Sequence, residues 1–216
     1  MTGFPDPFIL VLLLGGLALV PFLVVMVTAF AKIVIVLFLV RNALGVQQAP
    51  PNMVLYGITI ILTVYITMPL LRDMWRSVDD PSLDYGSTAA WAAAAERARE
   101  PFRQYLLKYS DETERAFFLD STRRLWPAEA REGVTSEDLI ILVPAFTVSE
   151  LTKAFEIGFL LYLPFIAIDL IVSNILLAMG MMMVSPLTIS LPFKLFLFVV
   201  VDGWTRLIHG LVLSYE

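Results

Sequence analysis

Apolar residues form four long segments along the chain, and most polar residues lie between the second and the third. The first segment, Pro7–Val40, contains a single charged residue, Lys32. A helix of roughly 20 apolar residues crosses about 30 Å of hydrocarbon, so this segment is longer than one straight span requires. A Gly-Gly pair and Pro21 lie inside it and predict a kink or break near residues 15–21.

The second segment, Asn52–Leu71, contains no charged residue and predicts one membrane helix that starts after two consecutive prolines. The third segment begins at Leu139. The Thr-Ser-Glu-Asp sequence before it predicts a helix start with acidic residues in the first turn. Pro144 and Pro164 are predicted to break this segment.

The polar stretch, residues 72–138, holds 24 of the 35 charged residues, ten of them basic and fourteen acidic. A loop rich in Pro, Ser and Gly is predicted at 81–87. The helical pattern then predicts one helix over Thr88–Tyr109 that is kinked at Pro101. A second helix is predicted over Glu112–Leu125. Its expected buried face consists of Phe117, Phe118 and Leu125.

The fourth apolar segment, Phe193–Leu213, follows Pro186 and Pro192. Together these elements predict an all-α protein of integral-membrane type, with four apolar segments arranged as helical hairpins and several of them broken by Pro or Gly. A small helical extramembrane domain lies between the second and third segments. The predicted domains are residues 1–71, 72–138 and 139–216.

The charges of the connectors predict the orientation in the membrane. Two apolar segments on each side of the polar stretch place that stretch and both chain ends on one side. The short connectors carry Arg41 and Lys194, whereas the polar stretch has a net charge of −4. Because connectors rich in Lys and Arg stay in the cytoplasm, the polar domain is predicted on the periplasmic side.

Composition agrees with a membrane protein and disfavours several functions. Hydrophobic residues make up 58% of the chain and charged residues 16%, against about 45–50% and 25% in ordinary soluble domains. The net charge of −5 disfavours nucleic-acid binding. The chain has no cysteine, and His209 is its single histidine, so we predict no metal site, no cofactor and no catalytic residue. The N-terminal apolar run has no basic residue before it and is interpreted as a retained segment, not a removed signal peptide.

Ionisable residues inside apolar segments are candidate functional residues, because each is costly to place in lipid. Glu150, Lys153 and Glu156 are spaced three apart and can pair along a helix. One interpretation is a self-neutralised patch at a helix or subunit contact. The other is the lining of an aqueous path or a register for binding a partner.

Four further charges lie in the last two segments. Asp169 has no basic neighbour within a helical turn, so its partner must come from elsewhere, and Lys194 and Arg206 are the candidates. Asp202 precedes Arg206 in the last segment. We group all of these charged residues as candidate buried or inter-subunit contacts.

Four of the nine methionines cluster at Met179, Met181, Met182 and Met183. Three consecutive methionines cannot all face one side of a helix, and Gly180 and Pro186 favour a break or hinge in the chain here. The simpler interpretation is that these flexible side chains fill a core. Alternatively, if several copies meet around an axis, the methionines would form a soft apolar ring that excludes ions yet parts for a polypeptide.

Three stretches carry a family resemblance: PAFTVSELTKAFEIGF at 144–159, LPFIAIDLIVSNILLAMGMMMVSP at 163–186 and LPFKLFLFVVVDGW at 191–204. They resemble the FliP/SctR family, which are core proteins of the type III secretion and flagellar export apparatus. The short polar domain makes the chain look more like the injectisome SctR branch than the flagellar one.

The resemblance implies properties that the residue pattern does not. It implies a pentamer that assembles with FliQ/SctS-like and FliR/SctT-like subunits around a pore for unfolded secreted proteins. It places the complex at the bacterial inner membrane, in contact with lipid and projecting to the periplasmic side. The methionine cluster then resembles the family's pore gasket, the charged residues would lie at buried inter-subunit contacts, and nothing in the resemblance points to catalysis.

Two other functions remain as alternatives. A secondary transporter or ion channel would use Glu150, Lys153 and Asp169 as an ion path, but no internal repeat relates the two halves of the chain. A membrane enzyme would need a nucleophile motif or metal-binding spacing, and the sequence contains neither.

Overall fold

The computed structural model describes residues 7–79 and 88–216, and this part of the chain folds into helices with no strand. The helices are α1 (Pro7–Met26), α2 (Phe30–Leu44), α3 (Asn52–Val78), α4 (Thr88–Tyr109), α5 (Glu112–Leu125), α6 (Ala128–Arg131), α7 (Leu139–Ala178), α8 (Pro186–Val200) and α9 (Gly203–Leu213). The predicted all-α fold is confirmed. The loop predicted at 81–87 lies outside the described residues.

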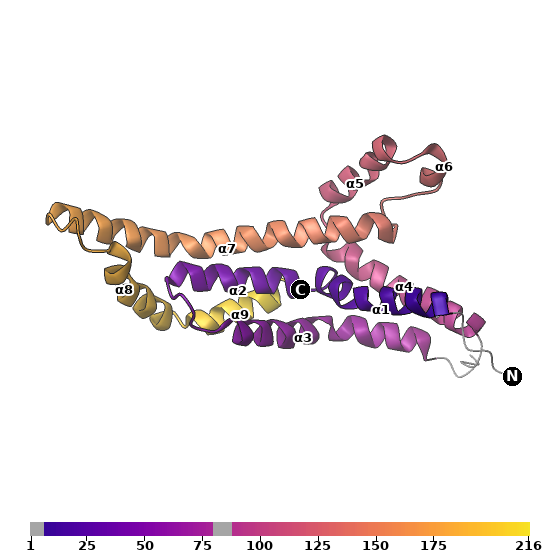
Figure 1. Ribbon diagram of the computed structural model, residues 1–216, viewed down its shortest axis with the longest axis horizontal. Coiled ribbons are helices and arrows are strands. Elements are labelled where there is room, and N and C mark those ends of the chain that lie inside the picture. Colours follow the sequence, from indigo (N-terminus) through magenta and orange to yellow (C-terminus); the bar gives the residue numbers. More distant parts are fainter. Residues whose placement is uncertain (1–6, 80–87) are drawn as a thin grey trace.

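The long helix α7 runs along the molecule, with α2, α9 and α3 beneath it (Figure 1). At one end α7 turns back into α8, and near its other end α5 and α6 stand apart from the main body. The sequence predicted the bounds of α4 and α5 correctly, and α4 continues through Pro101 without interruption. Helix α3 begins at the predicted residue but continues to Val78, beyond the predicted end of the apolar segment at Leu71.

Helix α2 forms the centre of the core. Its small and branched side chains pack against α3, α7, α8 and α9, and each of those helices contributes buried residues to the same cluster. The members from α2 and the residue before it are Ala29, Ile33, Val36, Leu37, Val40, Ala43 and Leu44. A second cluster of Val27, Leu106, Leu142 and Phe146 joins α4 to the start of α7.

The first apolar segment bends later than predicted. Helix α1 continues through the Gly-Gly pair and Pro21, and the break falls at residues 27–29, where the axes of α1 and α2 differ by 58°. Hydroxyl groups bond backbone groups at this break: Thr147 Oγ1 donates to the Met26 carbonyl at 3.4 Å, and the Phe30 N–H donates to Thr28 Oγ1 at 3.5 Å. The prediction of a break near 15–21 was therefore wrong.

Prolines interrupt the later segments less than predicted. Helix α7 is continuous over 40 residues and contains both Pro144 and Pro164. A helical proline removes one hydrogen bond, and packing holds the helix together here, because Ala145 and Phe165 beside the two prolines are buried. Helix α8 starts at Pro186, before the predicted start of the last segment at Phe193, and Pro192 lies inside the helix.

The last apolar segment breaks at Asp202, whose φ of 53° is left-handed. The axes of α8 and α9 differ by 61° across this residue. Close packing fixes the bend, since a Cβ on neighbouring Gly203 would collide with the Phe198 ring. The sequence predicted a single segment, Phe193–Leu213, and did not predict this break.

Two local predictions in the polar stretch were also wrong. The predicted buried face of α5 is largely exposed, with Phe117 and Leu125 at 61% and 77% exposure, because α5 buries Thr122 instead. Helix α7 begins at Leu139, after the acidic residues that were predicted for its first turn. Asp138 turns back and accepts hydrogen bonds from the Thr135 N–H at 2.7 Å and hydroxyl at 3.2 Å.

The described helices include two that are long and apolar enough to cross a membrane, α3 and α7. The count rises to four if each bent pair, α1–α2 and α8–α9, is one span. Large apolar side chains remain exposed along α1, α3, α7 and α8. Continuous apolar surface of this kind is covered by lipid or by other subunits.

Close approach of α2 and α7 depends on Gly158. A Cβ at this position would overlap the Leu39 side chain, and the Leu39 Cβ lies only 3.2 Å from it. We expect Gly158→Val to destabilise the fold by about 1–3 kcal/mol through overpacking. Thermal unfolding in detergent measures this change. Gly57→Val in α3 is the matched control, because no atom lies within 4 Å of its Cβ position. Equal unfolding midpoints for the two variants would contradict the prediction.

Candidate functional site

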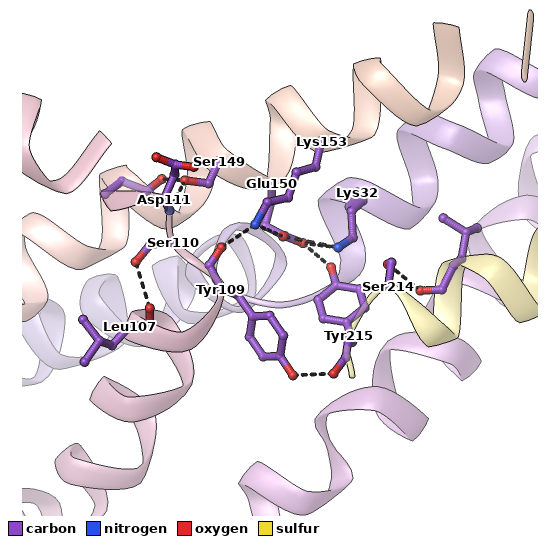
Figure 2. A network of polar contacts seen from close by, with 12 residues as sticks. Lys32, Leu107, Tyr109, Ser110, Asp111, Ser149, Glu150, Lys153, Ser214 and Tyr215 are labelled. Atoms are coloured by element: carbon purple, nitrogen blue, oxygen red, sulfur yellow. Dashed lines mark hydrogen bonds and ion pairs between the residues drawn. The ribbon is translucent and has the colours of Figure 1, made fainter. Parts of the chain in front are cut away.

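A buried lysine–glutamate pair lies where α2, α7 and the C-terminal end meet (Figure 2). Lys32 Nζ lies 3.3 Å from both carboxylate oxygens of Glu150, and the two side chains are 1% and 0% exposed. Tyr215 completes the group, because its hydroxyl donates to Glu150 and its ring centre lies 3.5 Å from Lys32 Nζ. These contacts join three parts of the chain that are far apart in sequence.

Lys32 lies on the buried face of α2, which places its side chain beside Glu150. Lys32 follows Ala29 by three residues and precedes Val36 by four, so the three share one side of the helix. Ala29 and Val36 are fully buried in the core. The apolar stem of the lysine packs with them, and its charged end reaches across to α7. A charge in this position requires an opposite charge, which Glu150 provides.

Lys153 forms the pair with Glu150 that its spacing predicted, at long range, and also bonds the backbone at the end of α4. Its Nζ donates to the backbone carbonyl of Tyr109 at 2.8 Å, and it lies 4.0 Å from Glu150. Its side chain is 41% exposed, so it contributes less to the neutralisation of Glu150 than Lys32 does. Glu156 is exposed and forms no ion pair within the described residues, so the possible Lys153–Glu156 pair is not formed.

The junction of α4 and α5 docks against the same part of α7. The Asp111 N–H donates to Ser149 Oγ at 2.8 Å, and the Tyr109 hydroxyl donates to the Tyr215 carbonyl at 2.6 Å. Asp111 also begins α5, where hydrogen bonding from the Thr113 N–H lowers the pKa of its carboxyl group. The polar stretch is thus connected to the Lys32–Glu150 pair through Tyr109 and Tyr215.

A second ion pair lies toward the other end of α7. Lys194 Nζ lies 2.6 Å from Asp169 Oδ2, donates to the Ala43 carbonyl at 3.1 Å and is 3% exposed. Ser190 Oγ donates to Asp169 Oδ1 at 2.6 Å. Of the two candidate partners for Asp169, the structure selects Lys194. This pair joins α7, α8 and the end of α2.

The remaining charged candidates lie at the surface of the single chain. Asp202 at the α8–α9 bend and Arg206 in α9 are exposed, and neither forms an ion pair within the described residues. Neither therefore belongs to the two buried pairs. Their predicted part in inter-subunit contacts stays a prediction.

The methionine tip, residues 179–183, caps the far end of α7 (Figure 1). Helix α7 ends in a Schellman motif: the Gly180 N–H donates to the Leu177 carbonyl at 3.0 Å, and the Met181 N–H donates to the Leu176 carbonyl at 2.9 Å. The left-handed φ of 73° at Gly180 suits glycine. Pro186 occupies the first turn of α8.

The methionines of this tip are the most exposed apolar group of the hairpin. Met182 and Met183 are 80% and 99% exposed, and Met179 and Met181 are exposed as well. Within a single chain they are not core residues, so the core-filling interpretation does not describe this chain on its own. A set of exposed thioethers at the end of a hairpin can pack against whatever meets it.

Exposed charges outside the apolar segments gather around Arg103 in α4. Its Nη2 and Nε donate to the Glu100 carboxylate at 2.7 and 2.8 Å, and its Nη1 lies 2.5 Å from Glu137. Hydrogen bonds from Arg103 and Gln104 lower the pKa of Glu100 to about 2. These contacts orient the turn before α7, but water screens them and they contribute little to stability.

Three residues of the buried centre were not predicted from sequence: Lys32, Tyr109 and Tyr215. Lys32 carried a signal, because it is the single charge within Pro7–Val40, and an isolated charge in an apolar segment requires a partner. The two tyrosines carried none, since their contacts depend on how the polar stretch and the C-terminal end fold back onto α7.

These features define an all-helical protein of membrane type, in which buried ion pairs hold a long apolar hairpin with an exposed methionine tip. Among the described residues, no group of three His, Asp or Glu side chains is arranged to hold a metal ion. A model of the FliP family matches residues 13–211, and the chain belongs to this family.

Related proteins match the chain over almost its whole length. The probable translocation protein y4yL of Sinorhizobium fredii is 56% identical, over 97% of this chain and 96% of that protein. The Yop proteins translocation protein R of Yersinia pestis is 52% identical, over 100% and 99%. The virulence protein YscR of Salmonella typhimurium is 46% identical, over 98% and 99%. The resemblance to the FliP/SctR family is therefore confirmed, on the injectisome side.

Proposed function

We propose that the chain is a pore-forming core subunit of a type III secretion export apparatus, which assembles as an oligomer and conducts unfolded protein substrates. Membership of the FliP family supports this proposal, as do relatives named for translocation and virulence. The role is structural, because the two buried ion pairs, Lys32–Glu150 and Lys194–Asp169, hold helices together.

The methionine tip is the observation that carries the proposal. It lies at one extreme of the molecule, on a tight turn fixed by Gly180 and Pro186, and its methionine side chains are exposed in the single chain. When copies meet around an axis, Met181–Met183 of each copy form the gasket. Flexible thioethers repack around a passing polypeptide and offer ions no strong polar site.

The exposed apolar faces of α3, α7 and α8 supply surfaces for assembly. Further copies of the chain cover part of these surfaces in a pentamer. FliQ/SctS-like and FliR/SctT-like subunits and lipid of the bacterial inner membrane cover the rest. The complex projects to the periplasmic side. The exposed Glu156, Asp202 and Arg206 then face neighbouring subunits, where each can find a charged partner.

An ion-conducting transporter is the competing function. It would require Glu150 and Asp169 to bind and release ions along a water-filled path. Both carboxylates are occupied by buried lysines, Lys32 and Lys194. A carboxylate already neutralised at close range has little electrostatic attraction left for a cation, so we favour the protein-export function.

Replacing Met181, Met182 and Met183 together by alanine tests the gasket. The side chains shorten without adding charge, so the complex should assemble and export some substrate but leak small ions. We expect slow growth under salt challenge and a raised conductance for the purified complex in planar bilayers. The matched control is Met53→Ala, which removes an equally exposed methionine from the start of α3. Normal assembly without added conductance would refute the gasket.

A further inference from the structure

A polar cavity of about 480 Å³ lies where the α2–α3 connector turns, well away from the Lys32–Glu150 pair. Arg41 from the last turn of α2, Gln47 and Gln48 from the connector, and Pro51 and Asn52 at the start of α3 line it. The connector joins two apolar helices, so this cavity lies at the polar boundary of the apolar region.

Arg41 is buried beside this cavity, and no anionic side chain pairs with it among residues 7–79 and 88–216. It is only 9% exposed, and its guanidinium lies 4.6 Å from the Phe38 ring. Both of its hydrogen bonds within the described residues start from Nη1, which lies 3.4 Å from the Pro50 carbonyl and 2.5 Å from Asn52 Oδ1. Nε is buried and has no acceptor. A buried cation that contacts only neutral acceptors is incompletely stabilised.

The start of α3 adds further donors. The Val54 and Leu55 N–H groups both donate to the Pro51 carbonyl, and the N–H groups of Asn52 and Met53 have no intrahelical acceptor. The positive end of a 27-residue helix therefore faces the cavity. The exposed amides of Gln47 and Gln48 offer side-chain donors at the opposite wall. The combined site is suited to an oxyanion.

The nearby ion pair does not neutralise Arg41. Lys194 lies close to the connector: its Nζ would be 3.9 Å from a Cβ atom built on Gly45. Its Nζ is already bonded to Asp169 and to the Ala43 carbonyl. Two cations and one carboxylate thus occupy this end of the molecule, which leaves one positive charge without a partner among the described residues.

The surface beside the cavity is apolar and contains aromatic residues. Met53 is 85% exposed on the first turn of α3, Tyr56 is exposed one turn further on, and Ile60 and Ile61 continue the strip. Tyrosine at this level is typical of a membrane–water interface. We propose that the cavity binds the phosphate of an anionic membrane phospholipid, whose acyl chains lie along the Met53–Ile61 face of α3.

The phosphate oxygens take Nη2 of Arg41, which has no hydrogen bond among the described residues, and the free N–H groups of α3. The glycerol and acyl chains follow the exposed strip. A free phosphate would use the same donors but gain nothing from the strip. A carboxylate from a second copy would fill the cavity only in the oligomer. The lipid is favoured because the charge and the apolar strip adjoin each other at one boundary.

The test uses the full-length chain purified in dodecyl maltoside. Dioleoyl phosphatidylglycerol is titrated into wild-type protein and into Arg41→Gln, Arg41→Lys and the double variant Gln47→Ala/Gln48→Ala, with thermal unfolding as the readout. The double variant removes exposed side chains only, so it keeps the test valid if Arg41→Gln folds poorly. Arg72→Gln is the matched control, because it removes an exposed arginine that lies on α3, 20 residues after Asn52.

We expect the lipid to raise the unfolding midpoint of wild type and Arg72→Gln equally. The apparent affinity should fall about tenfold or more in Arg41→Gln and in the double variant, which is the effect of losing hydrogen bonds to a charged group. Arg41→Lys should recover part of the lost affinity, since lysine keeps the charge but not the planar donor edge of arginine. Equal responses in all five proteins, equal stabilisation by inorganic phosphate, or a response confined to the oligomer would each overturn the proposal.

Discussion

Replacing Lys32 by methionine should lower the unfolding temperature of the chain markedly below that of wild type. The substitution keeps the long apolar stem but leaves the Glu150 carboxylate in a site where it is 0% exposed. Removal of one partner from a buried ion pair costs on the order of 3–5 kcal/mol. For a chain of this length, that corresponds to a midpoint lower by roughly 10 °C.

The control for this prediction is Lys153→Met. Lys153 lies 4.0 Å from Glu150 and is 41% exposed, so its loss should cost no more than about 1 kcal/mol. The spacing of the sequence pointed to Lys153 as a partner of Glu150, and the structure places Lys32 closer to that carboxylate. If Lys153→Met proved as destabilising as Lys32→Met, the assignment of Lys32 as the main partner would be wrong.

The double variant Lys32→Met/Glu150→Leu separates the pair from its surroundings. Removing both charges avoids an unpaired buried group, so the double variant should be more stable than Lys32→Met alone. Tyr215 donates to Glu150 in wild type, and a leucine there would leave its hydroxyl without that acceptor. The double variant should therefore remain less stable than wild type.

The sequence predicted helices most accurately where local signals and tertiary packing agree. The bounds of α4 and α5 were predicted from the helical pattern of apolar and charged residues, and in the structure Asp111 caps α5 by accepting a hydrogen bond from the Thr113 N–H. The methionine tip was predicted as a break because Gly180 and Pro186 are unfavourable within a helix. Its left-handed glycine and the Schellman motif are the physical reason.

The errors occurred where packing overrode local propensity. Pro144 and Pro164 were expected to end a helix, but buried neighbours hold α7 straight through them. The bend at residues 27–29 has no strong helix breaker, and its backbone groups are bonded partly by Thr147, about 120 residues away in sequence. No local pattern contains that information.

In the candidate site, too, local signals were predicted correctly and contacts that depend on tertiary packing were not. Glu150, Lys153 and Asp169 stood out because charges are rare in apolar segments, and Lys194 was correctly named as a candidate partner of Asp169. The pairing of Glu150 with Lys32 spans 118 positions and depends on how α2 packs on α7. The part played by Tyr109 and Tyr215 depends on the fold of the whole chain, so composition and spacing could not indicate it.

Replacing Lys194 by methionine should have the second large effect, and it should act on the methionine tip as well as on stability. Lys194 is 3% exposed and contacts Asp169 at 2.6 Å, whereas Asp169 is 28% exposed. Because water can partly solvate the carboxylate that is left behind, we expect a cost of about 3 kcal/mol, at the lower end for a buried pair. Thermal unfolding in detergent measures it, and Arg206→Met is the matched control because Arg206 is exposed on α9.

The second readout of Lys194→Met concerns the α7–α8 hairpin. Lys194 connects α8 to α7 through Asp169 and to the end of α2 through the Ala43 carbonyl, and the methionine tip joins the same two helices. Loss of these contacts should loosen the hairpin, so amide hydrogen exchange at residues 179–185 should rise, with little change at α4. Lys194→Met/Asp169→Leu should recover stability, because no unpaired charge remains, but it should not recover the hydrogen bond to α2. Unchanged exchange at the tip in the single variant would show that packing alone holds the hairpin and that the ion pair does not position the methionines.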